Sequence, residues 1–396
     1  MNNIRRNILF ALPILLLLCL TGCWSSQEIE EQNVYVGLAL DVGEPSETEL
    51  ELAKKEENYP KKNFITLTIQ TLQTGGGGSQ QKGSPKSKKY LNTEETGDSV
   101  FQLIRQFSLR FDRPLIGHHL KVVVISSELA REINLEKQLK FIFRDNDIRP
   151  SCVVLISKEK ASKTLISNKP EVVPSFYLRG IVDNQFRNNK ILQPMTLSKL
   201  NGIMNSGSSF ILQNVISTKG EVEFAGAGII KGKLNKLIGT LNEHDVEALS
   251  WITGKSKGGV LKTYDKSGEV LTYEIKSVNT KIKSKVQGND ISFHVSITSE
   301  GRLIENWNTS EVPSDNKYLK ESEDDFEQEL KEMVYKIIHK LQEVYHVDVA
   351  GFGNELRIEH PMVWKKVKKD WDETFSQSEI TYDVDLKITD YGSSTK

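Results

Sequence analysis

A cysteine near the start of the chain stands in a context suited to covalent lipid attachment. Small and apolar residues precede it in the order typical of a bacterial lipobox: Leu20, Thr21, Gly22 and Cys23. In such a motif the cysteine sulfur carries a diacylglyceryl group, and after cleavage the new amino terminus is acylated too. One fatty chain holds a protein on a bilayer weakly, whereas two or more hold it stably. The motif therefore predicts firm anchoring of Cys23 in membrane lipid.

The residues before the lipobox have the layout of a secretory signal. Arg5 and Arg6 form a positive start, and an apolar run of 13 residues follows, Ile8–Leu20. A membrane-spanning helix needs about 20 residues, so this run is too short for a permanent anchor. We expect residues 1–22 to be removed as a lipoprotein signal peptide. The alternative, a plain secretory signal with Cys23 unmodified, stays open.

Other residues that could do chemistry are few. Cys152 lies in a short apolar, strand-like run, which favours a buried thiol over a nucleophile. With Cys19 removed and Cys23 acylated, no intramolecular disulfide can form. His118 and His119 begin a predicted strand, where neighbours point to opposite faces, so they are poorly placed to share a metal. We expect no catalytic residue, no metal site and no cofactor.

Composition describes a globular body on this tether. Charged residues make up 27% of the chain, and the mean hydropathy is −0.39. After Cys23 no apolar run approaches the length of a membrane span. The formal net charge of the precursor is −1, and losing Arg5 and Arg6 makes it more negative. Nucleic acid is therefore not expected as a partner.

The first part of the chain predicts alternating strands and helices. Such alternation is typical of βαβ units, so we predict an N-terminal α/β domain over residues 23–200. A glycine-, serine- and lysine-rich stretch at 74–90 has too little apolar surface to order itself, and predicts a flexible loop. The expected strands are 34–41, 64–72, 119–125 and 151–157, and the expected helices are 98–111, 135–143 and 159–167.

Two further domains are predicted. Runs at 210–216, 223–230 and 234–241, followed by a short helix at 245–252, indicate a small antiparallel middle domain over 205–262. Residues 265–392 predict a C-terminal antiparallel sheet covered by long helices, with strands at 271–286, 291–304 and 381–388. The fold class is thus α+β or α/β in three domains.

Two C-terminal helices are predicted from apolar spacing. The first carries a long apolar stripe from Phe326 to Tyr345, and Ser322 with Asp325 has the spacing of a capping box at its start. The second, Pro361–Phe375, has an aromatic side and a lysine side formed by Lys365, Lys366 and Lys369. These lysines form either a solvated face or a contact with anionic lipid headgroups, where each contributes about 1 kcal/mol.

Several short motifs occur in order along the chain: Gly22-Cys23-Trp24, Val36–Asp41, Gly117–Lys121, Arg144–Pro150, Asp348–Gly353, Trp364, Trp371, Phe375 and Gly392. In this order they resemble the Ger(x)C proteins, the C subunits of bacterial spore germinant receptors. The resemblance covers essentially the whole chain, although the glycine-rich stretch at 74–90 departs from it.

The resemblance implies a three-domain lipoprotein on the outer face of the spore inner membrane. It implies two membrane-embedded partners, the A and B subunits, and a role in nutrient-triggered germination. In the family, those subunits are the better candidates for germinant binding and ion release. We therefore expect a non-enzymatic subunit that acts through tethering and protein–protein contact.

Two other functions stay open at this point. A solute-binding lipoprotein would need a two-lobed parallel architecture, which the long antiparallel strands disfavour. A cell-wall hydrolase would need a set of catalytic carboxylates or a Cys/His/Asp set, and none stands out in the sequence.

Overall fold

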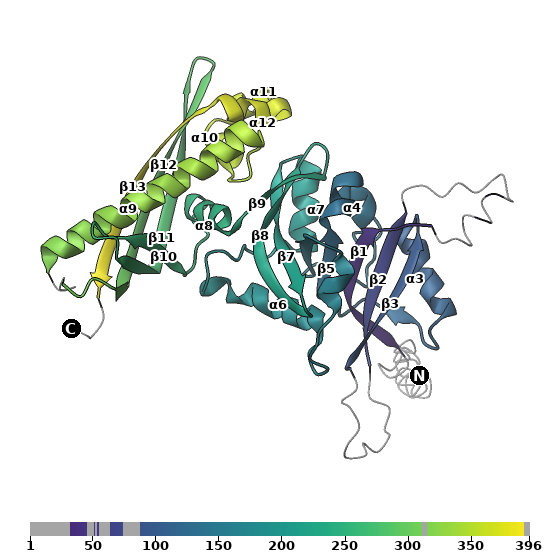
Figure 1. Ribbon diagram of the computed structural model, residues 1–396. Coiled ribbons are helices and arrows are strands. Elements are labelled where there is room, and N and C mark those ends of the chain that lie inside the picture. The colour runs from purple at the N-terminus through teal and green to yellow at the C-terminus, as the bar shows by residue number, and fades with distance from the viewer. Residues whose placement is uncertain are drawn as a thin grey trace, which may run out of the picture.

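The computed structural model describes residues 32–45, 51, 54, 64–73, 88–310 and 315–391. The predicted signal peptide, the lipobox with Cys23 and nearly all of the loop at 74–90 lie outside these residues. No helix in the described ranges is long and apolar enough to cross a membrane. Figure 1 shows an elongated body with one sheet toward each end.

The first sheet contains nine strands in the described part of the chain, in the order β3-β2-β1-β5-β6-β7-β8-β9, with β4 beside β1. β1 runs antiparallel to β2 and parallel to β5, so the predicted mixed βαβ arrangement is confirmed. The strands are β1 (Asn33–Val42), β2 (Ile65–Leu72), β3 (Tyr90–Gly97), β4 (Leu115–Ile116), β5 (Val122–Ser126), β6 (Val153–Ser157), β7 (Phe210–Thr218), β8 (Glu221–Lys231) and β9 (Lys236–Leu241).

Helices cover both faces of this sheet, which explains why β5 and β6 are apolar at every position but their ends. One face packs on the core that contains Leu103, Leu129 and Leu200, and the other on the core that contains Leu165 and Leu178. The helices are α3 (Val100–Gln106), α4 (Ser127–Glu132), α5 (Leu135–Leu139), α6 (Pro174–Asp183) and α7 (Leu197–Ser206).

The predicted middle meander is present, but its strands extend the first sheet. β7, β8 and β9 pair antiparallel as expected. β7 also pairs in parallel with β6 through Ile156 and Asn214, because β6 would otherwise expose an unpaired edge. The boundary predicted near residue 205 therefore does not coincide with a break in the sheet. The predicted helix that follows is present as α8 (Glu243–Ile252).

The second sheet has the order β10-β11-β12-β13. The prediction that it is antiparallel is wrong for its last strand, because β13 runs parallel to β12. The helices between these two strands return the chain to the end where β12 begins, which allows parallel pairing. Its elements are β10 (Val260–Tyr264), β11 (Val270–Gln287), β12 (Asp290–Asn306), α9 (Asn316–His339), α10 (Phe352–Glu359), α11 (Pro361–Val367), α12 (Trp371–Gln377) and β13 (Glu379–Asp390).

α9 begins earlier than the sequence suggests. Its N-cap is Asp315, whose side chain accepts a hydrogen bond from the Lys317 N–H at 2.7 Å. Ser322 is buried inside the helix and donates to the Tyr318 carbonyl at 2.9 Å, so the predicted capping box is wrong. A π-helical segment, Lys340–Val344, ends the long helix and leaves Val344 exposed although the stripe predicts it as apolar core.

Several elements escaped the sequence patterns, and some helices were predicted too long. β3 is a polar strand with the sequence YLNTEETG, and α6 and α7 lie in a stretch for which no element was predicted. The helix predicted at 159–167 is only a 3-10 helix, Ala161–Leu165, held by Asp41 Oδ1, which accepts the Ala161 N–H at 2.6 Å. The second C-terminal helix is broken between α11 and α12 by a 3-10 turn, Lys368–Asp370.

β13 lies at the edge of its sheet, and α9 runs beside it. Glu327 Oε1 accepts the Leu386 N–H at 3.2 Å, and Glu323 Oε1 accepts the Ile388 N–H at 2.9 Å. Two carboxylates of α9 thus occupy backbone donors on the open side of this strand.

Candidate functional site

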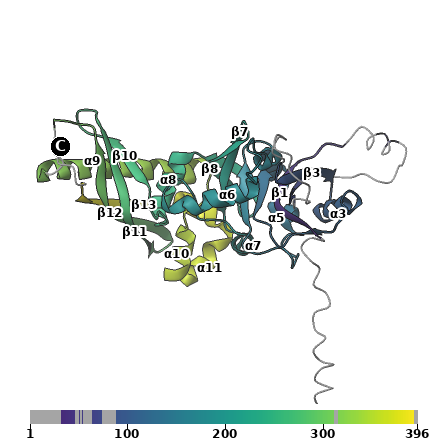
Figure 2. The same ribbon diagram turned by 90° about the horizontal axis from the view of Figure 1, so that it is seen from below.

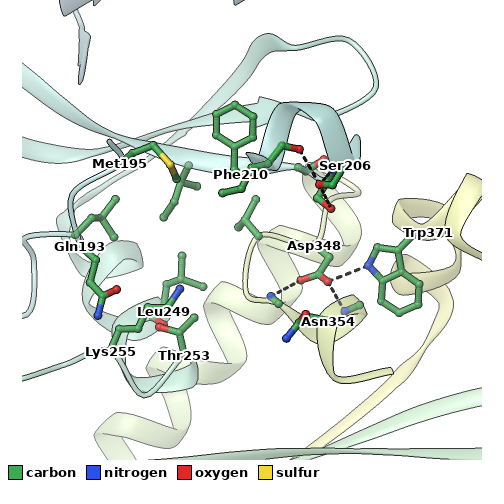
Figure 3. A pocket seen from close by; sticks show the side chains of 18 of the residues that line it. Gln193, Met195, Ser206, Phe210, Leu249, Thr253, Lys255, Asp348, Asn354 and Trp371 are labelled. Atoms are coloured by element: carbon green, nitrogen blue, oxygen red, sulfur yellow. Dashed lines mark hydrogen bonds between the residues drawn. The ribbon is translucent and has the colours of Figure 1, made fainter. Parts of the chain in front are cut away.

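A cavity of about 910 Å³ lies where the first sheet meets the C-terminal helices. Phe210 from the start of β7, Leu249 and Thr253 from the end of α8, and Asp348 and Trp371 from the C-terminal unit line it (Figure 3). Segments more than 100 residues apart in sequence therefore form its wall. A concave site of this size is the first place to look for chemistry.

Asp348 is the buried acid of this site, and its carboxylate organises the loop before α10. Oδ1 accepts the N–H groups of Ala350, Gly351 and Phe352 at 3.1, 2.8 and 3.2 Å. Oδ2 accepts the Gly353 N–H at 2.7 Å. Burial raises the pKa of Asp348, and these donors oppose that effect because they favour the charged form. The carboxylate serves as the cap that α10 otherwise lacks.

Trp371 supplies a fifth donor to the same acid. Its indole Nε1 donates to Asp348 Oδ2 at 2.9 Å, as Figure 3 shows. Gly353 lies beneath the ring, and a Cβ atom there would come within 2.5 Å of the indole nitrogen. Phe293 of β12 contacts Trp371 edge-on with ring centroids 6.1 Å apart. Residues 348–353 and Trp371, read from sequence as a family signature, thus build one polar and aromatic cluster.

Asp372 joins the C-terminal unit to the first sheet. Its Oδ2 accepts a hydrogen bond from the Ser209 hydroxyl at 2.9 Å and lies 3.0 Å from Lys231 Nζ. Its Oδ1 accepts the Asp348 N–H at 3.2 Å. Lys231 Nζ also donates to the His346 carbonyl at 2.6 Å. The Asp372 carboxylate thus bonds to residues of both the first sheet and the C-terminal unit, and this network fixes the wall of the cavity.

Two further contacts hold the same junction. The Tyr345 hydroxyl donates to the Thr240 carbonyl at 2.9 Å, and Lys340 Nζ donates to Asp245 at 2.6 and 2.8 Å. The apolar core of the C-terminal unit also includes Ala227 and Leu241 of the first sheet. The two sheets therefore share a core as well as a polar network.

The cavity has a mixed apolar and polar lining and carries cations without matching free acids. Lys255, Arg357, Lys368 and Lys369 line it, and Asp348 and Asp372, the acids of the wall, are already engaged in the hydrogen bonds above. Burial lowers the pKa of Lys255, and the charge of Lys199 adds to this effect. Such a lining is suited to holding neighbouring backbone and side chains in place, or to binding an anion.

The cysteine and histidines that the sequence analysis considered as reactive residues do not come together in the structure. Cys152 is buried in the first core, and burial raises the pKa of its thiol, which is the environment of an inert cysteine. His118 Nε2 is 3.4 Å from Asp147, outside the cavity. Burial lowers the pKa of His119, whose other neighbours are cationic. No group of three or more His, Cys, Asp or Glu residues in the described ranges could hold a metal ion.

Lys365, Lys366 and Lys369 lie on the exposed side of the segment from α11 to the 3-10 turn, with their side chains in solvent. Lys369 also reaches the rim of the cavity. Cys23, Leu20, Thr21 and Gly22 lie outside the described residues, so their predicted lipidation stays a prediction. Sequence reasoning did not identify Asp372, because its role depends on Ser209 and Lys231, both more than 100 residues away.

Two motif glycines outside the cavity are required by packing. A Cβ atom on Gly37 would lie 2.0 Å from the Ser175 hydroxyl oxygen. On Gly117 it would lie 2.4 Å from the Tyr35 hydroxyl oxygen. Both glycines permit a close approach of side chains that a larger residue would prevent.

Glu247 of α8 gives a test of electrostatics beside the cavity. Burial raises its pKa from the ordinary 4.5, although the Asn189 amide donates to its Oε1 at 3.2 Å. The folded protein therefore binds this proton more tightly than the unfolded chain, and stability falls as the pH rises above the ordinary glutamate range. We expect Glu247→Gln to stabilise the protein relative to wild type, with a gain that grows between about pH 4 and pH 7. Urea unfolding at both pH values measures it, and a gain that shrinks with pH would contradict it.

Comparison with known proteins decides the family. The sequence profile described as "Spore germination protein N-terminal domain" matches residues 25–216, and that described as "Spore germination B3/GerAC like, C-terminal" matches residues 225–392. The chain belongs to the Ger(x)C family of spore germination proteins. The resemblance expected from the sequence motifs is thereby confirmed.

Individual relatives match over nearly their whole length. Spore germination protein YndF of Bacillus subtilis (strain 168) is 44% identical over 384 residues, which are 96% of this chain and 95% of that protein. Spore germination protein B3 of the same organism is 32% identical over 386 residues, 97% of each chain. The crystal structure of the GerBC protein matches with a TM-score of 0.61 and 28% identity, covering 89% of this chain and 97% of that one. The α+β Ger(x)C fold is thus shared.

Proposed function

We propose that this protein is a non-enzymatic, lipid-anchored subunit of a spore germinant receptor, required for nutrient-triggered germination. The observation that carries the proposal is the match to Ger(x)C proteins over both family profiles, directly after a lipobox at Leu20–Cys23. Cys23 carries the lipid after removal of residues 1–22. The body then lies on the outer face of the spore inner membrane and contacts the membrane-embedded A and B subunits.

The geometry of the described site supports a binding role. Its two acids, the buried Asp348 and the partly buried Asp372, are engaged in holding backbone and neighbouring side chains. Neither has a nucleophile within its hydrogen-bond network other than the Ser209 hydroxyl, which lacks a general base such as histidine. A fixed junction between two sheets is suited to presenting surfaces to partner proteins.

The anchor is tested by replacing Cys23 with alanine in sporulating cells. Without the acyl chains, the protein is expected to leave the membrane fraction, because the mature chain has no other apolar segment of spanning length. Nutrient-induced germination is expected to fall with it. Fractionation by immunoblot and the loss of optical density after nutrient addition measure the two effects.

Cys152 provides the matched control, as the other cysteine of the mature chain. Its thiol is buried and unable to take a lipid, so Cys152→Ala is expected to leave membrane attachment unchanged. Membrane retention with normal germination in the Cys23→Ala strain would contradict the anchor.

The two other functions are separated by direct assays. A solute-binding lipoprotein would show saturable heat in calorimetric titration with amino acids or sugars, and the cavity beside Lys255 would be its site. A cell-wall hydrolase would clear a peptidoglycan suspension. Saturable binding heat in the titration, or clearing of the peptidoglycan suspension by the purified protein, would contradict the proposal of a purely non-enzymatic receptor subunit.

A further inference from the structure

The outward face of α11 and its continuation is basic around one exposed apolar side chain. Met362 is 68% exposed, and the spacing of the lysines that follow it puts them on the same side of the helix. In Figure 2, α10 and α11 project from one side of the body, away from the sheets. We call this surface the α11 basic face; it consists of Met362, Lys365, Lys366 and Lys369.

The opposite side of the same segment explains why this face points outward. Val363, Trp364 and Val367 pack against the C-terminal core, and Trp371 is buried in it. The Trp364 and Trp371 rings lie 5.4 Å apart in an edge-on contact. Because these contacts fix the rotation of α11, the lysines cannot turn inward to find partners.

Three acids close in sequence to the α11 basic face are occupied elsewhere. Asp370 lies 3.0 Å from Lys233, and Asp372 lies 3.0 Å from Lys231. Glu359 Oε2 accepts the Ser284 hydroxyl at 2.5 Å and the Ser284 N–H at 2.6 Å, and these hydrogen bonds lower the pKa of Glu359. Across the described ranges, no acid lies within ion-pair distance of the face's three lysines. Within the described residues, its positive charge therefore has no ion-pair partner.

An apolar side chain surrounded by unpaired lysines is complementary to an anionic bilayer surface. Long lysine side chains place their charge among headgroups while an apolar neighbour enters the interface. Ile358, near the end of α10, is 59% exposed beside the same segment. Met362 and Ile358 together give this charged surface two exposed apolar side chains that could enter the interface.

We propose that the α11 basic face lies on anionic lipid headgroups and forms a second membrane contact besides the lipid at Cys23. This inference rests on the proposed anchor, which holds the body near a bilayer. Eight residues lie between Cys23 and Gln32, so the tether reaches at most about 30 Å. Two separate contacts would fix the orientation of the body on the membrane, and with it the surfaces turned toward membrane-embedded partners.

The test uses the chain from residue 24, which carries no lipid but keeps all of the described core from Val34 onward. Binding is measured by co-sedimentation with vesicles of phosphatidylcholine mixed with phosphatidylglycerol, and with vesicles of phosphatidylcholine alone. We expect binding to the anionic vesicles only. It should weaken as salt rises from 0.1 M to 1 M, because the screening length falls from about 10 Å to about 3 Å.

The decisive variant replaces Lys365, Lys366 and Lys369 together with glutamine. Each lysine near the surface contributes about fivefold to binding, so the triple variant is expected to bind about a hundredfold more weakly. The matched control replaces Lys281, Lys283 and Lys285, exposed lysines in register on the open face of β11, and removes the same charge. It is expected to change binding less than tenfold.

Three results would overturn the inference: no binding of the wild-type chain to anionic vesicles, equal loss in both triple variants, or equal binding to both kinds of vesicle. Circular dichroism checks that each variant is folded. Because this form has no lipidated cysteine and the assay has no germination step, failure here leaves the Cys23 anchor and the receptor role standing. Failure of the Cys23→Ala experiment would equally leave this measurement valid.

Discussion

Replacing Asp348 with alanine is expected to lower the free energy of unfolding by about 4 kcal/mol or more, one of the largest effects of any single side chain in this protein. Its carboxylate accepts hydrogen bonds from four backbone N–H groups and from Trp371 Nε1. The substitution removes all five acceptor contacts at once. Each buried donor left without a partner costs about 1–3 kcal/mol, and relaxation of the loop recovers part of this.

Urea unfolding followed by tryptophan fluorescence measures the effect of Asp348→Ala, since Trp371 reports on the same cluster. Asp370→Ala serves as the control, because Asp370 is 78% exposed and forms an ion pair with a lysine that is itself exposed. Its loss is expected to cost less than about 1 kcal/mol. Similar stability losses in the two variants would show that the Asp348 network does not stabilise the fold.

Replacing Gly37 with alanine is expected to cost about 2–3 kcal/mol, because the new methyl group would lie 2.0 Å from the Ser175 hydroxyl oxygen. That hydroxyl donates to Gln70 Oε1 at 2.6 Å, and Gln70 Nε2 in turn donates to the Leu165 carbonyl at 2.8 Å. The methyl group must therefore displace a buried side chain that is held by its own hydrogen bonds. The midpoint of thermal unfolding measures the loss.

Gly180 provides a control of opposite sign. It lies within α6, and a Cβ atom there would meet nothing within 4 Å. Alanine favours a helix over glycine by up to about 1 kcal/mol, so Gly180→Ala is expected to raise the midpoint slightly. Adding Ser175→Ala to Gly37→Ala should recover part of the lost stability by removing the oxygen that clashes. No recovery would show that a different contact restricts position 37.

Much of the secondary structure follows from apolar spacing alone. β1, β5 and β6 are apolar runs whose burial matches their sequence pattern, whereas β2 alternates with polar residues and is buried at most of its positions. β3 escaped because its own residues are polar. Its stability comes from the ladder to β2 and from cross-strand pairs such as Thr66 with Thr96 and Gln70 with Asn92. A strand held mainly by its neighbour leaves little periodic signal in its own sequence.

The organisation of the sheets was harder to predict than their strands. Whether β7 continues the first sheet depends on its pairing with β6, about 55 residues earlier in the chain, and no local pattern encodes that pairing. The direction of β13 likewise depends on the path of four helices. The lysines of α11 were predicted as an outward face and are exposed, because apolar spacing also fixes the rotation of a helix.

The junction site was predicted only in part. Asp348, Gly353 and Trp371 belong to a motif visible in the sequence, but their common role depends on one carboxylate that gathers five donors. Asp372 carries no such signal, since its partners Ser209 and Lys231 come from the other sheet. A local sequence window contains neither of these contacts.

The two glutamates that α9 presents to β13 also affect how neighbouring copies of the protein meet. A bare edge strand is a template on which another chain can add its own strand, and a crowded array of copies would give many such encounters. Here Glu323 and Glu327 already occupy the donors of Ile388 and Leu386. Two copies approaching through this edge would also bring four carboxylates together. Dense packing of these molecules is therefore compatible with separate, individually folded bodies, without growth of a continuous fibre.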